Sequence, residues 1–104
     1  MFCSIKRLFN NGSKSPAEVL RYGPVIIDVR TKDEFNEGHI AGSKNIPLDE
    51  IKLQVDMIRQ WNKPVVTVCR SGHRSAIAMK MLKAAGLEVY NGGAWSALKN
   101  RIND

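Results

Sequence analysis

Thiol and imidazole side chains are scarce in this chain of 104 residues, which contains two cysteines and two histidines. Cys3 and Cys69 stand far apart, and one pair does not make the disulfide framework of a small secreted domain. His39 and His73 are equally isolated, so no spacing typical of a metal site is present. These shortages exclude a disulfide-stapled scaffold, give no reason to expect a metal, and favour a reducing compartment.

Long apolar stretches are also missing. No run approaches the roughly 20 residues of a membrane-spanning helix, and residues 1–9 lack the extended apolar segment of a signal peptide. We therefore expect a cytoplasmic protein that does not bind a membrane. The formal net charge is +6, but the basic residues are scattered from Lys6 to Arg101 and form no strip with aromatic residues between them. The charge predicts anionic partners and argues against nucleic acid.

The remaining composition is that of an ordinary globular protein, with 43% hydrophobic and 25% charged residues. This length fits one domain with a modest core. Apolar residues recur at helical spacing from Phe2 to Phe9. We therefore expect residues 1–14 to be an N-terminal extension that contains a short helix, and residues 15–104 to form the domain.

Strand and helix signals alternate along the predicted domain. Ser15, Pro16 and Glu18 mark one helix start, and Thr31 with Glu34 marks another. The predicted strands are 25–29, 44–46, 65–68 and 87–90. Further helices are predicted at 49–61, 75–85 and 94–101, with a turn at 92–93. Alternating elements with apolar strands predict an α/β fold, in which helices cover both faces of a parallel sheet. Ligands bind such sheets beyond the carboxyl ends of the strands.

The segment from Cys69 to Ser75 reads Cys-Arg-Ser-Gly-His-Arg-Ser and joins a predicted strand to a predicted helix. Backbone N–H groups converge at such a junction, and the helix dipole favours a negative charge there. A thiol at this position ionises readily. A small buried residue ending a strand is the alternative interpretation of Cys69. Arg70, His73 and Arg74 argue against it, because three side chains that carry or can take up a positive charge are costly to bury unpaired.

The other residues of this loop have roles that the sequence leaves partly open. Ser71 and Gly72 allow a tight turn whose N–H groups form an anion-binding concavity. Arg74 either binds a substrate or ties the loop to an acidic residue. Ser75 either caps the helix, which we favour, or donates a hydrogen bond to the sulfur. We expect His73 to point outward and not to act as a general base.

Asp28 and Arg30 flank the end of the first predicted strand and point to the same side. We expect them to form an ion pair that holds neighbouring loops, and we favour this over a catalytic carboxylate. His39 is predicted to be structural, closing a turn through a hydrogen bond. Trp61 and Trp95 are predicted to pack in or around the core.

Three groups of residues stand in a characteristic order along the chain. The first group is Asp28-Val29-Arg30, Glu34-Phe35, Gly38-His39-Ile40-Ala41-Gly42-Ser43 and Asn45-Ile46-Pro47. The second is Cys69-Arg70-Ser71-Gly72-His73-Arg74-Ser75, and the third is Gly92-Gly93-Ala94-Trp95. In this order they resemble the first signature, the active-site loop of active members and the C-terminal signature of the rhodanese-like domain family, over about residues 15–101.

This resemblance implies a three-layer α/β/α fold with a central, mostly parallel sheet of about five strands. It also implies a single-domain thiosulfate sulfurtransferase that needs no metal or organic cofactor. In such a protein the thiolate of Cys69 takes the outer sulfur of thiosulfate and releases sulfite. The persulfide then gives its sulfur to cyanide or a thiol.

By the same resemblance the loop binds the substrate and its surroundings are shaped by a few supporting residues. The residues expected to form the cradle are Arg70, Ser71, Gly72, His73, Arg74 and Ser75. Arg70 and His73 would bias which anion enters, and Arg74 would stabilise the loop. The supporting residues would be Asp28, Arg30 and His39.

Two alternatives remain at this level. In one, the chain is a sulfur carrier or partner-binding module, and Cys69 accepts sulfur from another protein. In the other, it is a phosphatase or arsenate reductase. The related enzymes of that second class separate cysteine and arginine by five residues, whereas four separate Cys69 from Arg74. The smaller cradle favours a sulfur atom over a tetrahedral phosphate.

Overall fold

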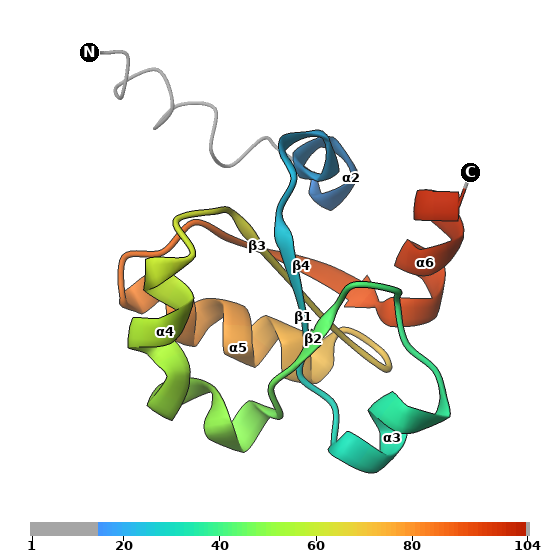
Figure 1. Ribbon diagram of the computed structural model, residues 1–104, viewed down its shortest axis with the longest axis horizontal. Helices are drawn as coiled ribbons and strands as arrows, with labels where there is room; N and C mark the ends of the chain where they lie inside the picture. Colours follow the sequence, from blue (N-terminus) through green and yellow to red (C-terminus); the bar gives the residue numbers. More distant parts are fainter. Residues whose placement is uncertain (1–14, 104) are drawn as a thin grey trace.

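The computed structural model describes residues 15–103, which form one sheet with helices packed on both of its faces (Figure 1). The helix predicted near the N-terminus lies outside the described residues, so that prediction and the domain boundary beside it stay predictions. Within residues 15–103, none of the helices combines the length and apolar character needed to cross a membrane.

The strands and helices alternate as the sequence predicts. The strands are β1 (Val25–Asp28), β2 (Lys44–Asn45), β3 (Val65–Cys69) and β4 (Val89–Ala94). The α-helices are α2 (Pro16–Val19), α3 (Lys32–Glu37), α4 (Val55–Gln60), α5 (His73–Ala84) and α6 (Trp95–Asn103). Two 3-10 helices, η1 (Leu20–Tyr22) and η2 (Leu48–Gln54), extend α2 and precede α4. Capping boxes begin α2 and α3 at the two predicted sites.

All four strands are parallel, in the order β2-β1-β3-β4. The predicted parallel α/β sheet is therefore confirmed. The described residues contain four strands and not the expected five or so. The sheet ends at one edge with the two-residue β2, and at the other edge β4 runs directly into α6.

β4 is longer than predicted, because it continues through Gly92 and Gly93, where we expected a turn. A register shift beside Thr67 and Val68 of β3 marks a bulge that accommodates the extra residue. A Cβ atom on Gly92 would lie 2.7 Å from the Cγ1 atom of Val66. Glycine at this position therefore allows two strands to pack closely and does not form a turn.

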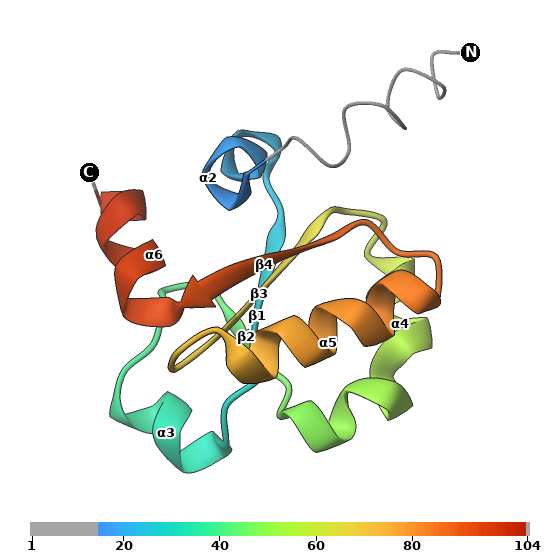
Figure 2. The same ribbon diagram turned by 180° about the vertical axis from the view of Figure 1, so that it is seen from behind.

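Two apolar clusters lie on opposite faces of the sheet. One joins the sheet to η2, α4 and α5 and includes Ile51, Ile58 and Leu82. The other joins the sheet to α2, η1 and α6 and includes Val19 and Leu98. Figures 1 and 2 show these helices on the two sides of the strands. Both faces of the central strands are therefore covered by packed apolar side chains, as expected for continuous apolar strands in a parallel sheet.

Candidate functional site

The site is built around Cys69, the last residue of β3, which is 1% exposed. A three-residue loop follows, and α5 begins at His73, two residues earlier than the sequence predicts. Gly72 is the N-cap residue and has φ 98°, a left-handed conformation that glycine adopts at little cost. The tight turn brings the first N–H groups of the helix back over the end of the strand.

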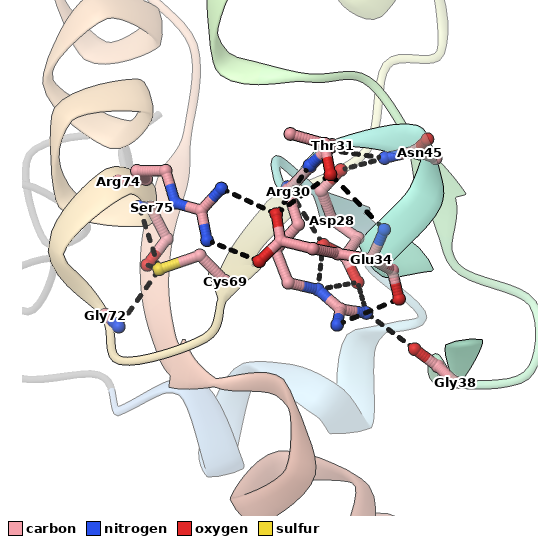
Figure 3. A network of polar contacts seen from close by, with 10 residues as sticks. All are labelled: Asp28, Arg30, Thr31, Glu34, Gly38, Asn45, Cys69, Gly72, Arg74 and Ser75. Atoms are coloured by element: carbon pink, nitrogen blue, oxygen red, sulfur yellow. Dashed lines mark hydrogen bonds and ion pairs between the residues drawn. The ribbon is translucent and has the colours of Figure 1, made fainter. Parts of the chain in front are cut away.

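The sulfur atom of Cys69 is surrounded by hydrogen-bond donors (Figure 3). The backbone N–H of Gly72 donates to it at 3.0 Å, and that of Ser75 at 3.4 Å. The Ser75 hydroxyl oxygen also lies 3.4 Å from the sulfur. Burial alone raises the pKa of the Cys69 thiol, but hydrogen bonds from Ser75, Gly72 and Ser71 outweigh it and lower the pKa. The loop therefore stabilises a thiolate inside an otherwise apolar setting.

Ser75 is not the helix cap that we favoured. Because α5 begins two residues earlier, Ser75 occupies its third position and is fully buried. Its hydroxyl donates to the side-chain oxygen Oδ1 of Asn91 at 2.7 Å. Its backbone carbonyl accepts from the hydroxyl of Thr67 at 2.9 Å. The alternative interpretation was a hydroxyl that donates to the sulfur. The hydroxyl oxygen does lie 3.4 Å from the sulfur, and either atom of that contact can be the donor.

Arg74 ties the loop to α3. Its two terminal nitrogens donate to the two carboxylate oxygens of Glu34, at 2.9 and 3.1 Å. The same carboxylate accepts from the backbone N–H of Thr31 and so belongs to the capping box of α3. These contacts, with that of Arg74 the largest, lower the pKa of Glu34 to about 2. Of the two roles left open for Arg74, the structure shows the tie to an acidic residue.

Asp28 and Arg30 form the predicted ion pair, and both side chains are almost fully buried. The guanidinium donates to both carboxylate oxygens, through Nε at 2.9 Å and Nη2 at 2.7 Å. Nη2 also donates to the carbonyl of Gly38 at 2.7 Å. The guanidinium lies 4.5 Å from the ring centroid of Trp95. The pair therefore holds the end of β1, the segment after α3 and the start of α6 together.

The remaining predicted residues lie at the surface. Arg70, Ser71 and His73 are exposed, and His73 points outward as expected. His39 also has the predicted structural role, because its Nδ1 atom lies 2.8 Å from the carbonyl oxygen of Phe35 and the two rings stack at 3.7 Å. It shapes the end of α3 and makes no contact with the sulfur.

Glu34 and Asn91 contact the site but were not assigned to it from the sequence. The sequence marks Glu34 as a helix-capping residue and as part of the first family signature, but not as the partner of Arg74, from which 40 positions separate it. Asn91 was not recognised at all, although its side chain contacts Ser75, Gly72 and Gly93. An asparagine followed by two glycines is a signal for a side-chain-to-backbone turn, and that signal could have found it.

No group of three or more His, Cys, Asp and Glu side chains capable of holding a metal occurs within residues 15–103. In the same part of the chain, every buried side-chain nitrogen and oxygen has a hydrogen-bond partner. The polar groups around Cys69 are therefore used for holding one another and the loop.

A family model for the rhodanese-like domain matches residues 13–100. The chain is 43% identical over 67 residues to the uncharacterized protein YqhL of Bacillus subtilis, covering 64% of this chain and 52% of that protein. It is 33% identical over 92 residues to a putative mitochondrial thiosulfate sulfurtransferase of Schizosaccharomyces pombe, covering 75% of this chain and 65% of that protein. Among solved structures, an Escherichia coli rhodanese with anions has a TM-score of 0.64 and 31% identity, covering 70% of this chain and 88% of that one. The chain thus spans about half to two thirds of the length of these two curated relatives.

Proposed function

This chain belongs to the rhodanese-like domain family, and we propose that it is a sulfurtransferase that carries sulfur as a persulfide on Cys69. The donor is thiosulfate or a related sulfane-sulfur anion, and the acceptor is cyanide or a thiol. One observation carries the proposal. The Cys69 sulfur lies at the start of a helix, within hydrogen-bonding distance of two backbone N–H groups and one hydroxyl.

The first half of the proposed reaction is a displacement at sulfur. The Cys69 thiolate attacks the outer sulfur of thiosulfate and forms a new S–S bond. The S–S bond of thiosulfate breaks, and its electron pair leaves with sulfite. The N–H groups of the loop stabilise the negative charge on the attacking sulfur before the step and on the persulfide after it. No proton transfer is needed, which agrees with the outward position of His73.

The second half regenerates the thiolate. Cyanide or the thiolate of the acceptor attacks the outer persulfide sulfur, and the S–S bond to Cys69 breaks. The electron pair returns to Cys69, while the acceptor leaves as thiocyanate or as a new persulfide. Cys69 ends in the state in which it started, so one thiol supports repeated turnover without a redox partner.

The geometry of Arg74 supports sulfur transfer over phosphoryl transfer. A phosphoryl group presents several charged oxygens, which a guanidinium binds in a fork of parallel hydrogen bonds. In this protein that fork is already used, because two of its nitrogens donate to Glu34. The N–H groups that remain directed at the sulfur suit a single charged atom.

The experiment is a thiocyanate assay with thiosulfate and cyanide, using Cys3→Ser as the matched control for Cys69→Ser. We expect the Cys3→Ser protein to retain turnover and the Cys69→Ser protein to fall to background. Full turnover by Cys69→Ser would overturn the proposal. Parallel assays with glutathione persulfide and mercaptopyruvate identify the donor class. A strong preference for mercaptopyruvate would contradict the choice of thiosulfate.

A further inference from the structure

The hydroxyl of Ser75 lies between two groups that compete for its single hydrogen atom. Its oxygen is 2.7 Å from Oδ1 of Asn91 and 3.4 Å from the sulfur of Cys69. An amide oxygen is an acceptor only, and a 2.7 Å separation is the usual length of a good O–H···O hydrogen bond. The hydrogen therefore points to Asn91, and the oxygen's lone pairs face the sulfur.

The backbone fixes the orientation of the Asn91 amide. Its Oδ1 atom accepts from the N–H of Gly93 at 2.9 Å, and its Nδ2 atom donates to the carbonyl of Gly72 at 3.2 Å. Turning the amide over would place two donors together at Gly93 and two acceptors together at Gly72. The bulge in β4 holds Asn91 in this place, so Oδ1 remains directed at Ser75.

This arrangement has different consequences for the two protonation states of Cys69. The neutral thiol donates its S–H to a free lone pair of the Ser75 hydroxyl. The thiol, the hydroxyl and the Asn91 amide oxygen then each have a hydrogen-bond partner at the same time. The thiolate has no hydrogen to donate and needs donors. The Ser75 hydroxyl then serves the sulfur only by turning away from Asn91, which loses a short hydrogen bond.

We propose that Asn91 is a positioning residue for Cys69, which holds the Ser75 hydroxyl in the orientation that favours the thiol and yields it when the sulfur ionises. Asn91 thus opposes the thiolate that the loop N–H groups favour. The thiol proton passes to solvent in this step, and no bond between heavy atoms changes. The link to sulfur transfer rests on the proposed function, whereas the effect on ionisation does not.

A test of this role has to leave the neighbouring charged and titratable side chains unchanged. Arg74 from α5, Glu34 from α3, and Asp28 with Arg30 from the end of β1 lie in the same polar network as the sulfur (Figure 3). Arg70 in the loop and His73 at the start of α5 are exposed. Arg74 interacts electrostatically with Cys69 and is held by Glu34. Substitutions at Asn91 and Ser75 leave all of these groups in the chain.

The test measures the pH dependence of iodoacetamide alkylation in a Cys3→Ser background, where Cys69 is the single thiol. Asn91→Ala frees the Ser75 hydroxyl, and we expect the alkylation midpoint to fall by about 0.5–1 pH unit, the size of one ordinary hydrogen bond. Ser75→Ala removes a donor to the thiolate and should raise the midpoint. With Ser75→Ala already present, adding Asn91→Ala should shift the midpoint no further.

Asn91→Asp supplies a second and opposite prediction. It keeps acceptors for Ser75 and Gly93 and adds a negative charge, so the midpoint should rise. A loop that is merely loosened would shift the midpoint in the same direction in both Asn91 variants, and would do so with or without the Ser75 hydroxyl.

Circular dichroism confirms the fold of each variant. An unchanged midpoint in folded Asn91→Ala, or an equal shift in the Ser75→Ala background, would overturn the role of Asn91. Alkylation does not depend on sulfur transfer. If Asn91→Ala shifts the midpoint as expected but the protein never loads sulfur from thiosulfate, the proposed function fails while the role of Asn91 stands.

Discussion

At the scale of single residues, the central feature of the site is the ionisation of one sulfur atom, that of Cys69. Cys69 is buried at the end of an apolar strand, and burial alone would keep its thiol neutral. Hydrogen bonds from Ser75, Gly72 and Ser71 reverse that preference, so its pKa lies below the usual range. The side-chain hydroxyl of Ser75 and the directions of the loop N–H groups therefore both decide how readily the sulfur ionises.

This reversal predicts the pH dependence of the thiol. Because folding lowers the pKa, the thiolate is populated at a lower pH in the folded protein than in the unfolded chain. The alkylation rate of the Cys3→Ser protein should rise with pH and level off at a midpoint below the value of about 8.5 for a free cysteine. The same protein in urea is the control and should show an unperturbed midpoint. A folded midpoint at or above the urea value would contradict the assigned hydrogen bonds.

At the scale of elements, α3 and α5 are joined at the site by one carboxylate. Glu34 caps α3 through Thr31 and pairs with Arg74 on α5, so the active-site loop cannot move without disturbing α3. Behind this link, the buried pair of Asp28 and Arg30 joins β1 to the segment after α3. The loop around the sulfur is thus held from outside as well as by its own turn.

The Glu34–Arg74 pair predicts a pH-dependent contribution to stability. The pKa of Glu34 is lowered to about 2 in the folded protein. The pair therefore stabilises the folded protein fully at pH values above the unfolded-state pKa of about 4.3, and this contribution is lost as the pH falls toward 2. Glu34→Gln keeps a side chain able to cap Thr31 but removes the charge. We expect it to lower the free energy of unfolding in urea by about 1 kcal/mol at pH 7, since both side chains are partly exposed and solvent screens the pair.

The difference in the free energy of unfolding between Glu34→Gln and the unmodified protein should decrease as the pH falls from roughly 5 to 2. Glu37→Gln, an exposed carboxylate on the same helix, is the matched control and should change stability little at any pH. A loss at Glu34→Gln that is the same at pH 7 and pH 2 would show that the charge on Glu34 is not its cause.

At the scale of the whole molecule, the parallel sheet brings distant segments to one edge. Arg30 follows β1, Cys69 ends β3, and Ala94 ends β4. The strand after each crossover returns in the same direction, so these ends meet where the sequence pattern predicted a binding edge. The net charge of +6 gives the molecule a general attraction for anions.

Much of this arrangement could be predicted from the sequence, because it depends on local patterns. Apolar runs gave the strands, capping boxes at Ser15 and Thr31 gave two helix starts, and the thiol at a strand end gave the nucleophile. The pairing of Asp28 with Arg30 also followed from their spacing of two residues along an extended strand.

The errors arise where distant segments decide the local structure. Gly92 lies in a strand because β3 packs against it, although glycine pairs in a sequence usually indicate a turn. Ser75 does not occupy the predicted cap position, because Gly72 is the N-cap residue and α5 begins at His73. The contact between Ser75 and Asn91 joins residues 16 positions apart, beside the bulge in β4, and the local pattern around Asn91 does not specify its partner.

The central claim is that Cys69 carries sulfur, and intact mass spectrometry tests it most directly. The Cys3→Ser protein, incubated with thiosulfate and freed of small molecules, should gain the mass of one sulfur atom. Adding cyanide should remove that mass and release an equal amount of thiocyanate. A folded Cys3→Ser protein that gains no mass, or a Cys3→Ser/Cys69→Ser protein that gains it, would contradict the account.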